Sequence, residues 1–382
     1  MKFEVYWERW QRWELSQVEA AEALGVTERT FRRWRQRYDE EGIDGLSDRR
    51  LGKPSPKRVP EAWADRVEQL YRERYVGFNA RHFWEHLVKD HGFPFSYSWA
   101  KTFLHRRQLV AMAPAKGTHR KKRPRRPLPG MLVHQDGSRH AWLPGRDWQI
   151  DLITTMDDAT NELYSAFLIE EEGTQSSFRG LRDVISRQGL FCALYTDRAG
   201  HYFYTPKAGE PVDKERLTQV GRALAQLGID HIPAYSPEAR GRSERLFGTL
   251  QDRLPKELRL AGIADIEAAN RFIAELYLPA HNARFAVPAE QPGAAFVRDR
   301  DGAFADILCI QEERVVGNDN TVRYRGLSLQ LPESRLRPHF VKAKVRVHDY
   351  LDGTIAVFHG PRRLATYDNQ GRLADHAQSL AA

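Results

Sequence analysis

The fold is decided by MLVHQDGSRHAWLPGRDWQIDLITTMDDATNELYSAFLI, residues 131–169. This stretch contains three apolar runs of strand length, at 131–138, 148–155 and 163–169, and the polar turn DDATNE separates the last two. Downstream, helical and strand patterns alternate. We expect helices at 174–188, 214–227, 241–254 and 265–279, and strands at 190–195 and 229–233. Residues 131–300 are therefore expected to form an α/β domain that begins with three successive antiparallel strands.

Three acidic side chains lie at the ends or edges of these elements. Asp136 ends the first apolar run, Asp197 directly follows the strand 190–195, and Glu244 lies on the helix 241–254. Three strands followed by strand–helix alternation is the order of a ribonuclease-H-like fold, in which the first and fourth strands are neighbours. Asp136 and Asp197 would then meet at one end of the sheet. Glu244 lies just off the apolar stripe of its helix and would reach the same place.

Such a cluster of carboxylates needs cations, because carboxylates without a counter-charge repel one another and their pKa values rise. Mg²⁺ prefers oxygen ligands, and Mn²⁺ is expected to substitute for it. Two such ions about 3.5–4 Å apart can activate the attacking oxygen and stabilise the leaving oxygen of an in-line displacement. We predict that Asp136 bridges both ions, that Asp197 holds one and that Glu244 holds the other.

The N-terminal part of the chain has the pattern of a DNA-binding helix-turn-helix. In SQVEAAEALGVTERTFRRWRQRY (16–38), Ser16 and Thr27 can cap two helices and Gly25 can make the turn between them. The second helix would enter a major groove. Its exposed face is expected to contain Glu28, Arg29, Thr30, Arg32, Arg33 and Arg35. We assign residues 1–50 to this domain and 51–59 to a linker.

Residues 60–112 are expected to form a second helix-turn-helix-like DNA-binding domain. Its last helix contains three cationic residues that could contact phosphates, Lys101, Arg106 and Arg107. His82 and His86 have the four-residue spacing of metal ligands. No cysteine lies near them in the sequence, and aromatic and aliphatic residues surround them. We therefore expect both histidines to pack as ordinary helix side chains.

A basic linker at 113–130 separates this domain from residues 131–300. Its prolines oppose helix and sheet, and its charges are expected to follow a phosphate backbone. The cations predicted to contact DNA there are Lys121, Lys122, Arg123, Arg125 and Arg126. After residue 300, short strands separated by turn signals predict a small all-β barrel at 304–370, which is similar to SH3-like domains and is also expected to bind DNA.

Composition narrows the function classes. The net charge is +8 and the isoelectric point is near 9.4, which indicates a polyanionic partner. With two cysteines far apart in 382 residues, the chain has no disulfide framework and no zinc site built on a local cysteine pair. The sequence contains neither an 18-residue apolar run nor a signal-peptide pattern. We expect a cytoplasmic, nucleoid-associated protein with no membrane contact.

Several segments together resemble the DDE transposases of bacterial insertion sequences, most closely the ISNCY-type group of the retroviral integrase superfamily. They are DGS (136–138), DDAT (157–160), YTDR (195–198), SPEARGRSERLFGTLQDRLPKELRL (236–260) and HNARFAVP (281–288). The resemblance implies Mg²⁺-dependent cleavage at transposon ends and joining of the 3′-hydroxyls to target DNA. It also implies double-stranded DNA partners, a homo-oligomer on paired ends and no small-molecule substrate. Asp136, Asp197 and Glu244 match the catalytic acids.

Arg240 and Arg242, beside Glu244, suit phosphate contacts in such an enzyme. One departure is the spacing, because 46 residues separate Asp197 from Glu244, more than in the retroviral pattern. We assign no role to the additional segment at 201–213. Two rival functions remain, a transposase-derived DNA-binding regulator without catalysis and a ribonuclease-H-type nuclease that cleaves without joining.

The first acidic position has a competitor. Asp151, in DWQIDL, superficially resembles the first catalytic strand of retroviral integrases. If Asp151 lay on the first strand, only one further strand, 163–169, would fit before the next helix. Asp136 leaves room for three strands, so we favour it. Other acids are weaker candidates for the site: Asp157 and Asp158 as turn residues, Glu238 before the helix, and Asp252 beyond Glu244.

Overall fold

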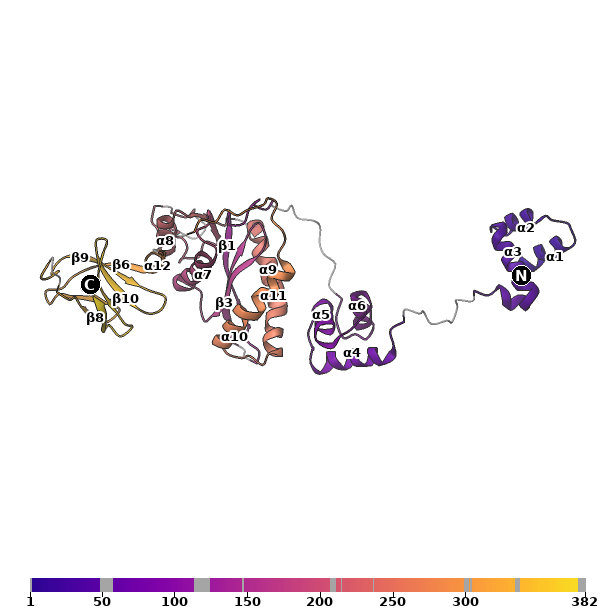
Figure 1. The fold of residues 1–382 in the computed structure, drawn as a ribbon, viewed down its shortest axis with the longest axis horizontal. Coiled ribbons are helices and arrows are strands. Elements are labelled where there is room, and N and C mark those ends of the chain that lie inside the picture. The colour runs from indigo at the N-terminus through magenta and orange to yellow at the C-terminus, as the bar shows by residue number, and fades with distance from the viewer. Residues whose placement is uncertain are drawn as a thin grey trace. The chain divides into compact units, whose positions relative to one another are not determined.

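A computed structural model describes residues 2–48, 58–112, 124–145, 148–206, 211–213, 215–235, 237–298, 302, 304–333 and 337–376. The chain divides into two compact units, residues 1–70 and 71–382. Figure 1 shows the order of helices and strands along the chain. In the described ranges, no helix combines the length and the apolar character needed to cross a membrane.

The N-terminal unit contains the predicted helix-turn-helix. Its first elements are α1 (Lys2–Gln11), α2 (Gln17–Ala23), α3 (Glu28–Glu41) and a short 3₁₀-helix, η1 (Gly42–Leu46). Ser16 caps α2 and Thr27 caps α3, as predicted. Gly25 makes the turn with a φ of 68°, a conformation that favours glycine. Phe31 and Ala21 are buried between the helices.

Three further helices follow: α4 (Glu61–Glu73), α5 (Ala80–His91) and α6 (Tyr97–Arg106). The side chain of Asn79 caps α5 by accepting the backbone N–H of His82. Gly92 ends α5 in the left-handed conformation. Ser96 caps α6. These caps explain where both helices begin.

The central α/β region is built on a five-stranded mixed sheet with the order β3-β2-β1-β4-β5. Its strands are β1 (Val133–His140), β2 (Ile150–Asp157), β3 (Leu163–Ile169), β4 (Ala193–Thr196) and β5 (Asp230–Pro233). The first three strands are antiparallel, and β4 and β5 run parallel to β1. The sequence prediction of three successive strands followed by strand–helix alternation is confirmed.

Helices cover both faces of this sheet (Figure 1). They are α7 (Thr174–Arg187), α8 (Gln219–Leu227), α9 (Pro237–Leu260), α10 (Ile266–Phe272), the π-helix η2 (Ile273–Tyr277) and α11 (Leu278–Phe285). One core cluster joins α7 and α8 to the sheet through Phe178 and Leu224. A second cluster joins α9 to the sheet through Leu250 and Leu254. The sheet is thus the middle layer of three.

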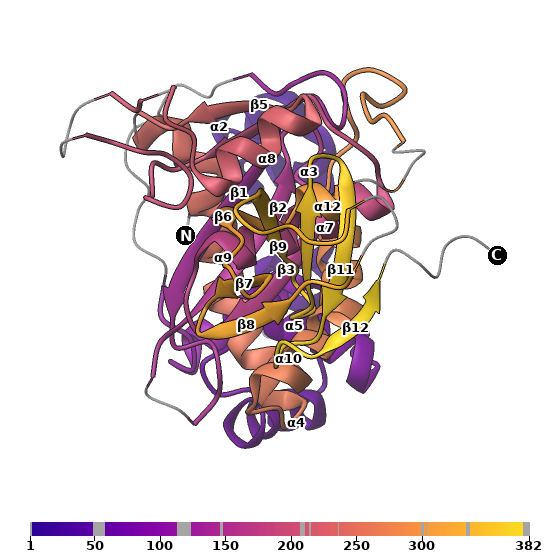
Figure 2. The same cartoon turned by 90° about the vertical axis from the view of Figure 1, so that its left-hand side faces the viewer.

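The C-terminal region is all-β after one short helix, α12 (Phe304–Ile307). Its strands are β6 (Ile310–Val315), β7 (Thr321–Tyr324), β8 (Leu327–Gln330), β9 (Lys344–Asp349), β10 (Ile355–His359), β11 (Arg362–Tyr367) and β12 (Leu373–His376). Five of them form a sheet in the order β12-β11-β10-β9-β6, and β7 pairs with β8. In Figure 2 this region faces the viewer, with β8, β11 and β12 labelled among its strands. Both sheets contribute to one core around Val347 and Leu329.

Candidate active site

Asp136 and Asp197 lie level with each other at the junction of β1 and β4. The two strands are parallel, with His134 opposite Tyr195, and the same register continued by two residues places Asp136 opposite Asp197. The rings of His134 and Tyr195 have centroids 5.1 Å apart, so both side chains point to one face of the sheet. Because side chains alternate along a strand, Asp136 points to that face too, and Asp197 directly follows the last residue of β4, Thr196.

Backbone amides hold both aspartates. One carboxylate oxygen of Asp136 accepts the N–H of Gly137 at 3.1 Å, and the side chain is buried. The side chain of Asp197 is half-buried and accepts the N–H of Ala199 at 3.0 Å. The hydroxyl of Thr154, on the neighbouring strand β2, donates to the backbone carbonyl of Asp136. These contacts fix the two acids at the end of the sheet.

The helix α9 lies against β1 and carries Glu244 toward this place. Gln251 on α9 donates from Nε2 to Oγ of Ser138 on β1 at 3.0 Å. Glu244 precedes Gln251 by seven residues, about two helical turns, so the two share one face of α9. Gly248 lies between them on that face, and a Cβ there would meet nothing within 4 Å. Glu244 itself is exposed, so this face of α9 is open near the level of Asp136.

A buried ion pair holds the N-terminal part of α9 to the sheet. Asp158 is fully buried and accepts a hydrogen bond from Nε2 of His134 at 2.8 Å. Its carboxylate also meets Nη1 of Arg242 at 3.0 Å and the backbone N–H of Arg126 at 2.8 Å. Burial alone would raise the pKa of Asp158, but the bonds from His134 and Arg126 and the charge of Arg242 outweigh it and lower the pKa. Arg242 therefore positions the turn of α9 that carries Glu244.

Arg242 was expected to contact DNA, and the structure places it differently. Its guanidinium pairs with the internal Asp158 and is mostly buried. The side chain of Arg125, also expected on DNA, likewise donates from Nη1 to the turn after β2, at Ala159 and Asn161. Arg242 is thus engaged inside the protein, whereas Arg125 remains exposed while it bonds the turn. Sequence inspection treated Asp158 as a simple turn residue and missed its role.

A fourth carboxylate, Glu172, lies against β1 at Gly137 and was not singled out from the sequence. A Cβ added to Gly137 would lie 2.2 Å from Oε2 of Glu172, so only glycine lets this carboxylate lie against β1. His201 Nε2 is 3.6 Å from the other oxygen of Glu172. Burial raises the pKa of Tyr202, and the negative charges of Glu172, Asp136 and Asp197 raise it further. The hydroxyl of Tyr202 donates to Oε1 of Gln135 at 3.0 Å, on the opposite face of β1 from Asp136.

Asp151 lies elsewhere on the sheet. It is the second residue of β2, opposite Arg139, and in the strand order β2 does not touch β4. Its Oδ2 accepts the backbone N–H of Glu172 at 2.9 Å. The strand order thus places Asp136, and not Asp151, beside the strand that leads to Asp197.

The structure does not bring Asp136, Asp197 and Glu244 to a single point. Over the ranges that the structure describes, one group of metal-ligating side chains has all its ligand atoms within 4.8 Å of one another: His82, His86 and Glu257. The strands and the helix therefore bring the three acids to one region of the fold, but their carboxylates do not all lie within 4.8 Å of one another. Repulsion between like charges favours that separation in the absence of a cation.

The predicted DNA-contacting residues of α3 are mostly on its surface. Arg29, Arg32 and Arg33 are exposed. Arg35 is half-buried, with its guanidinium 4.4 Å above the ring of Trp10. The remaining two are Glu28, which accepts a bond from Gln17, and Thr30, whose N–H bonds the capping Thr27.

Further along the chain, Lys101, Arg106 and Arg107 are exposed on or just after α6. Arg126 has an exposed side chain, although its backbone N–H bonds Asp158. The predicted residues that lie outside the described part of the chain are Lys121, Lys122, Arg123 and the side chain of Arg240.

Comparison with known proteins gives consistent matches. A helix-turn-helix domain family matches residues 8–55. Over 340 residues the chain is 30% identical to y4bF of Sinorhizobium fredii NGR234, which is named as a transposase; the match covers 88% of this chain and 73% of that protein. Over 374 residues it is 24% identical to the transposase for insertion sequence IS1202 of Streptococcus pneumoniae, covering 87% of this chain and 78% of that protein.

Among solved structures, two viral integrase assemblies align with the chain. One is the simian T-cell lymphotropic virus intasome in complex with PP2A regulatory subunit B56 gamma, with 15% identity and a TM-score of 0.33, covering 76% of this chain and 91% of that one. The other is the HTLV-2 integrase catalytic core domain in complex with magnesium, with 15% identity and a TM-score of 0.29, covering 38% of this chain and 82% of that one.

Proposed function

Because this chain belongs to the transposases of bacterial insertion sequences, we propose that it cuts DNA at transposon ends and joins the 3′-hydroxyl ends to target DNA. We assign the chemistry to Asp136, Asp197 and Glu244. The observation that supports this proposal is the parallel pairing of β1, which contains Asp136, with β4, which directly precedes Asp197, and the contact of α9 with β1 on the helix face that includes Glu244.

The finer fold assignments belong to the same proposal. We assign the central sheet to the ribonuclease-H-like fold, supported by three antiparallel strands followed by β4 and β5 parallel to β1. We assign the C-terminal strands to an SH3-like barrel, supported by two small sheets that enclose one core. The domain boundaries expected from the sequence are proposed with these assignments.

The donor set of the site fits hard divalent cations. Asp136, Asp197 and Glu244 offer carboxylate oxygens, which Mg²⁺ and Mn²⁺ prefer over nitrogen or sulfur. The buried Tyr202 with its raised pKa stays neutral beside them and adds no further negative charge. Two bound Mg²⁺ ions would activate the attacking oxygen and stabilise the leaving oxygen of an in-line displacement.

The residues around the acids prepare the site for this chemistry. Hydrogen bonds from Gly137 and Ala199 orient the carboxylates of Asp136 and Asp197. The pair Arg242–Asp158 holds the start of α9, so Glu244 approaches the sheet along a fixed helix. The exposed face around Gly248 leaves room for a DNA backbone to lie against α9.

DNA recognition is assigned to the helical domains. The exposed Arg29, Arg32 and Arg33 on α3 can contact bases and phosphates in a major groove. Lys101, Arg106 and Arg107 would contact a second part of the same transposon end. We also propose that two or more copies act together on paired ends, inside the cell and close to its DNA.

One assay tests the proposal against its rivals. The full-length protein is incubated with labelled transposon-end DNA and a target plasmid in Mg²⁺. Joined products support the transposase. Nicks without joining indicate a nuclease, and a gel shift without cleavage indicates a regulator; either result would overturn the proposal.

A further inference from the structure

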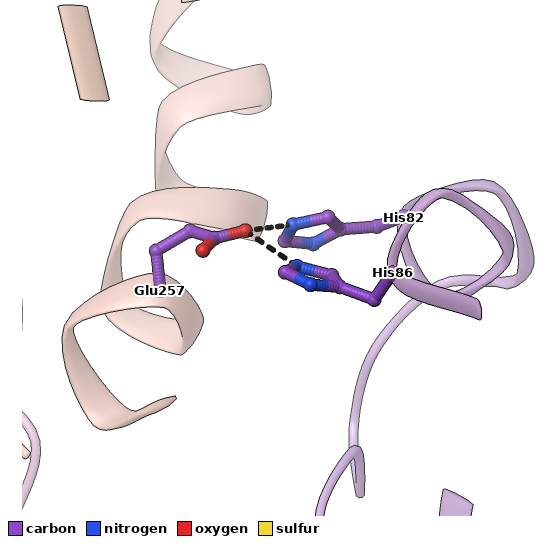
Figure 3. Close-up of side chains that lie close together, drawn as sticks. All are labelled: His82, His86 and Glu257. Carbon is purple, nitrogen blue, oxygen red and sulfur yellow. Dashed lines mark hydrogen bonds and ion pairs between the residues drawn. The ribbon is translucent and has the colours of Figure 1, made fainter. Parts of the chain in front are cut away.

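A second cluster of potential metal ligands lies between α5 and α9, away from the acidic site. His82 and His86 are one helical turn apart on α5 and point to Glu257 on α9 (Figure 3). Nε2 of His82 is 2.5 Å from Oε1 of Glu257, and Nε2 of His86 is 2.9 Å from the same oxygen. The side chains come from positions more than 170 residues apart in the sequence.

The surroundings of this cluster are apolar and close-packed. His82 is 2% exposed, and the ring of Phe78 stacks on it at 4.4 Å between centroids. The ring of Tyr75 lies 5.2 Å from that of His86. In such a setting a polar group without a partner is costly. Among the residues that the structure describes, none nevertheless bonds Nδ1 of His82.

In the neutral form of His86, the lone pair of Nε2 faces Glu257. Nδ1 of His86 is 2.7 Å from Oδ2 of Asp90. An ionised carboxylate only accepts hydrogen bonds, so Nδ1 carries the proton of the neutral ring. Nε2 of the neutral ring is then an acceptor that faces an acceptor, Oε1 of Glu257. A proton on Nε2 or a metal cation between the two atoms removes this conflict.

We propose that His82, His86 and Glu257 bind a divalent transition-metal ion of the Zn²⁺ class. Two imidazole nitrogens and one carboxylate oxygen suit Zn²⁺, whereas Mg²⁺ prefers oxygen alone. Ligand atoms about 2.0–2.1 Å from a tetrahedral ion lie about 3.3–3.4 Å apart. The rings therefore need to withdraw from Glu257 by less than about 1 Å. Asp90 takes the place of the outer carboxylate that orients a metal-bound histidine.

The ion would tie the second helical domain to the helix that carries Glu244. Glu257 lies on α9 thirteen residues after Glu244, about 20 Å along the helix. Other polar contacts join the same two parts of the chain: Glu85 accepts hydrogen bonds from Nη1 and Nη2 of Arg253, and Arg259 donates to the backbone carbonyl of Val76. The metal would complete this interface, so occupancy links DNA-end binding to the position of α9.

Metal content and affinity test the proposal directly. The full-length protein is stripped with a chelator and titrated with Zn²⁺ in the presence of millimolar Mg²⁺, which occupies carboxylate sites. We expect one Zn²⁺ per chain, and with Co²⁺ the visible absorption typical of a tetrahedral site. His86→Gln and Glu257→Gln should each weaken Zn²⁺ binding by at least about 100-fold.

Two control variants locate the ion. Asp197→Asn should keep full Zn²⁺ affinity, because Asp197 belongs to the acidic site. His105→Gln, on α6, should keep it as well. Wild-type protein that takes up no Zn²⁺ overturns the proposal whatever the variants do. Uptake that is equal in wild type and His86→Gln, or that is lost in Asp197→Asn, overturns it too.

Discussion

At the scale of single residues, Asp158 shows how the candidate active site depends on a buried charge. Its carboxylate is buried and is balanced by Arg242 and by hydrogen bonds from His134 and the backbone of Arg126. Removing one partner of a buried pair leaves the other charge uncompensated, which costs about 3–5 kcal/mol. The position of Glu244 therefore depends on a side chain two residues away that is paired inside the protein.

The substitution Arg242→Gln tests this dependence. We expect the free energy of unfolding of the central domain to fall by about 3–5 kcal/mol, while binding to transposon-end DNA is retained. Urea unfolding monitored by hydrogen exchange in β1 and α9 gives the first quantity, and gel shifts give the second. Arg245→Gln is the matched control. Arg245 is exposed, and its Nε donates to the backbone carbonyl of Gly241 in its own helix. Equal stability of the two variants would refute the role of Arg242.

The sequence was informative about acids at strand ends and uninformative about their partners. Asp136 and Asp197 follow from apolar runs, because local patterning marks where a strand ends. Glu172 is not visible in this way, since its place beside Gly137 depends on how a loop folds back on β1. The same limit applies to Glu257. Its proximity to His82 and His86 arises only when α5 and α9 pack together.

At the scale of elements, the edge of the sheet contains a pH-dependent contact. His231 on β5 stacks on Phe203 with ring centroids 3.9 Å apart, and its Nε2 lies 3.0 Å from Oγ1 of Thr196 on β4. Burial, with a smaller contribution from the charge of His201, lowers the pKa of His231 to about 4. The unfolded chain binds this proton near pH 6.5. The stability that the protein gains by burying neutral His231 is therefore fully present above about pH 6.5 and is lost as the pH falls toward 4.

Replacement of this histidine should flatten that dependence. For His231→Gln we expect the pH slope of unfolding free energy between pH 6.5 and 4 to decrease by up to about 1.4 kcal/mol per pH unit. Urea midpoints at a series of pH values, monitored by protection of β4 and β5, measure the slope. The exposed His339→Gln is the control and should leave it unchanged. An unchanged slope in His231→Gln would show that this contact does not titrate as described.

Most elements of the central domain could be predicted because their patterns are local. Strands expected at 148–155 and 163–169 are found as β2 and β3, and the expected helix 174–188 is found as α7. The helix expected at 214–227 begins later, at Gln219, where the hydroxyl of Thr218 caps it. A cap can override a longer helical pattern, because it satisfies the first free amides of the helix.

At the scale of the whole molecule, the distribution of charge predicts how DNA binding responds to salt. The net charge is +8, and Arg29, Arg32 and Arg33 are exposed on α3. Each phosphate neutralised by a cation contributes about 0.9 to the slope of log affinity against log salt. We expect end binding to weaken steeply with salt, and the triple substitution of these arginines by Gln to reduce the slope by up to about 2.7.

Fluorescence anisotropy with end DNA at a series of salt concentrations measures this slope. Arg12→Gln is the matched control. Arg12 directly follows α1, its side chain is exposed and it pairs with Glu8, so its replacement should leave the slope unchanged. A flat response in the wild-type protein would contradict a binding mode based on phosphate contacts.

The central claim is that Asp136 on β1 and Asp197, directly after β4, form the chemical centre with Glu244. The most direct test is the yield of joined DNA for Asp136→Asn and Asp151→Asn, measured side by side with retained end binding in both. We predict a loss of at least about 1000-fold for Asp136→Asn, as several kcal/mol of lost charge stabilisation imply. Asp151→Asn should stay active. Joining by Asp136→Asn together with an inactive Asp151→Asn would contradict the account.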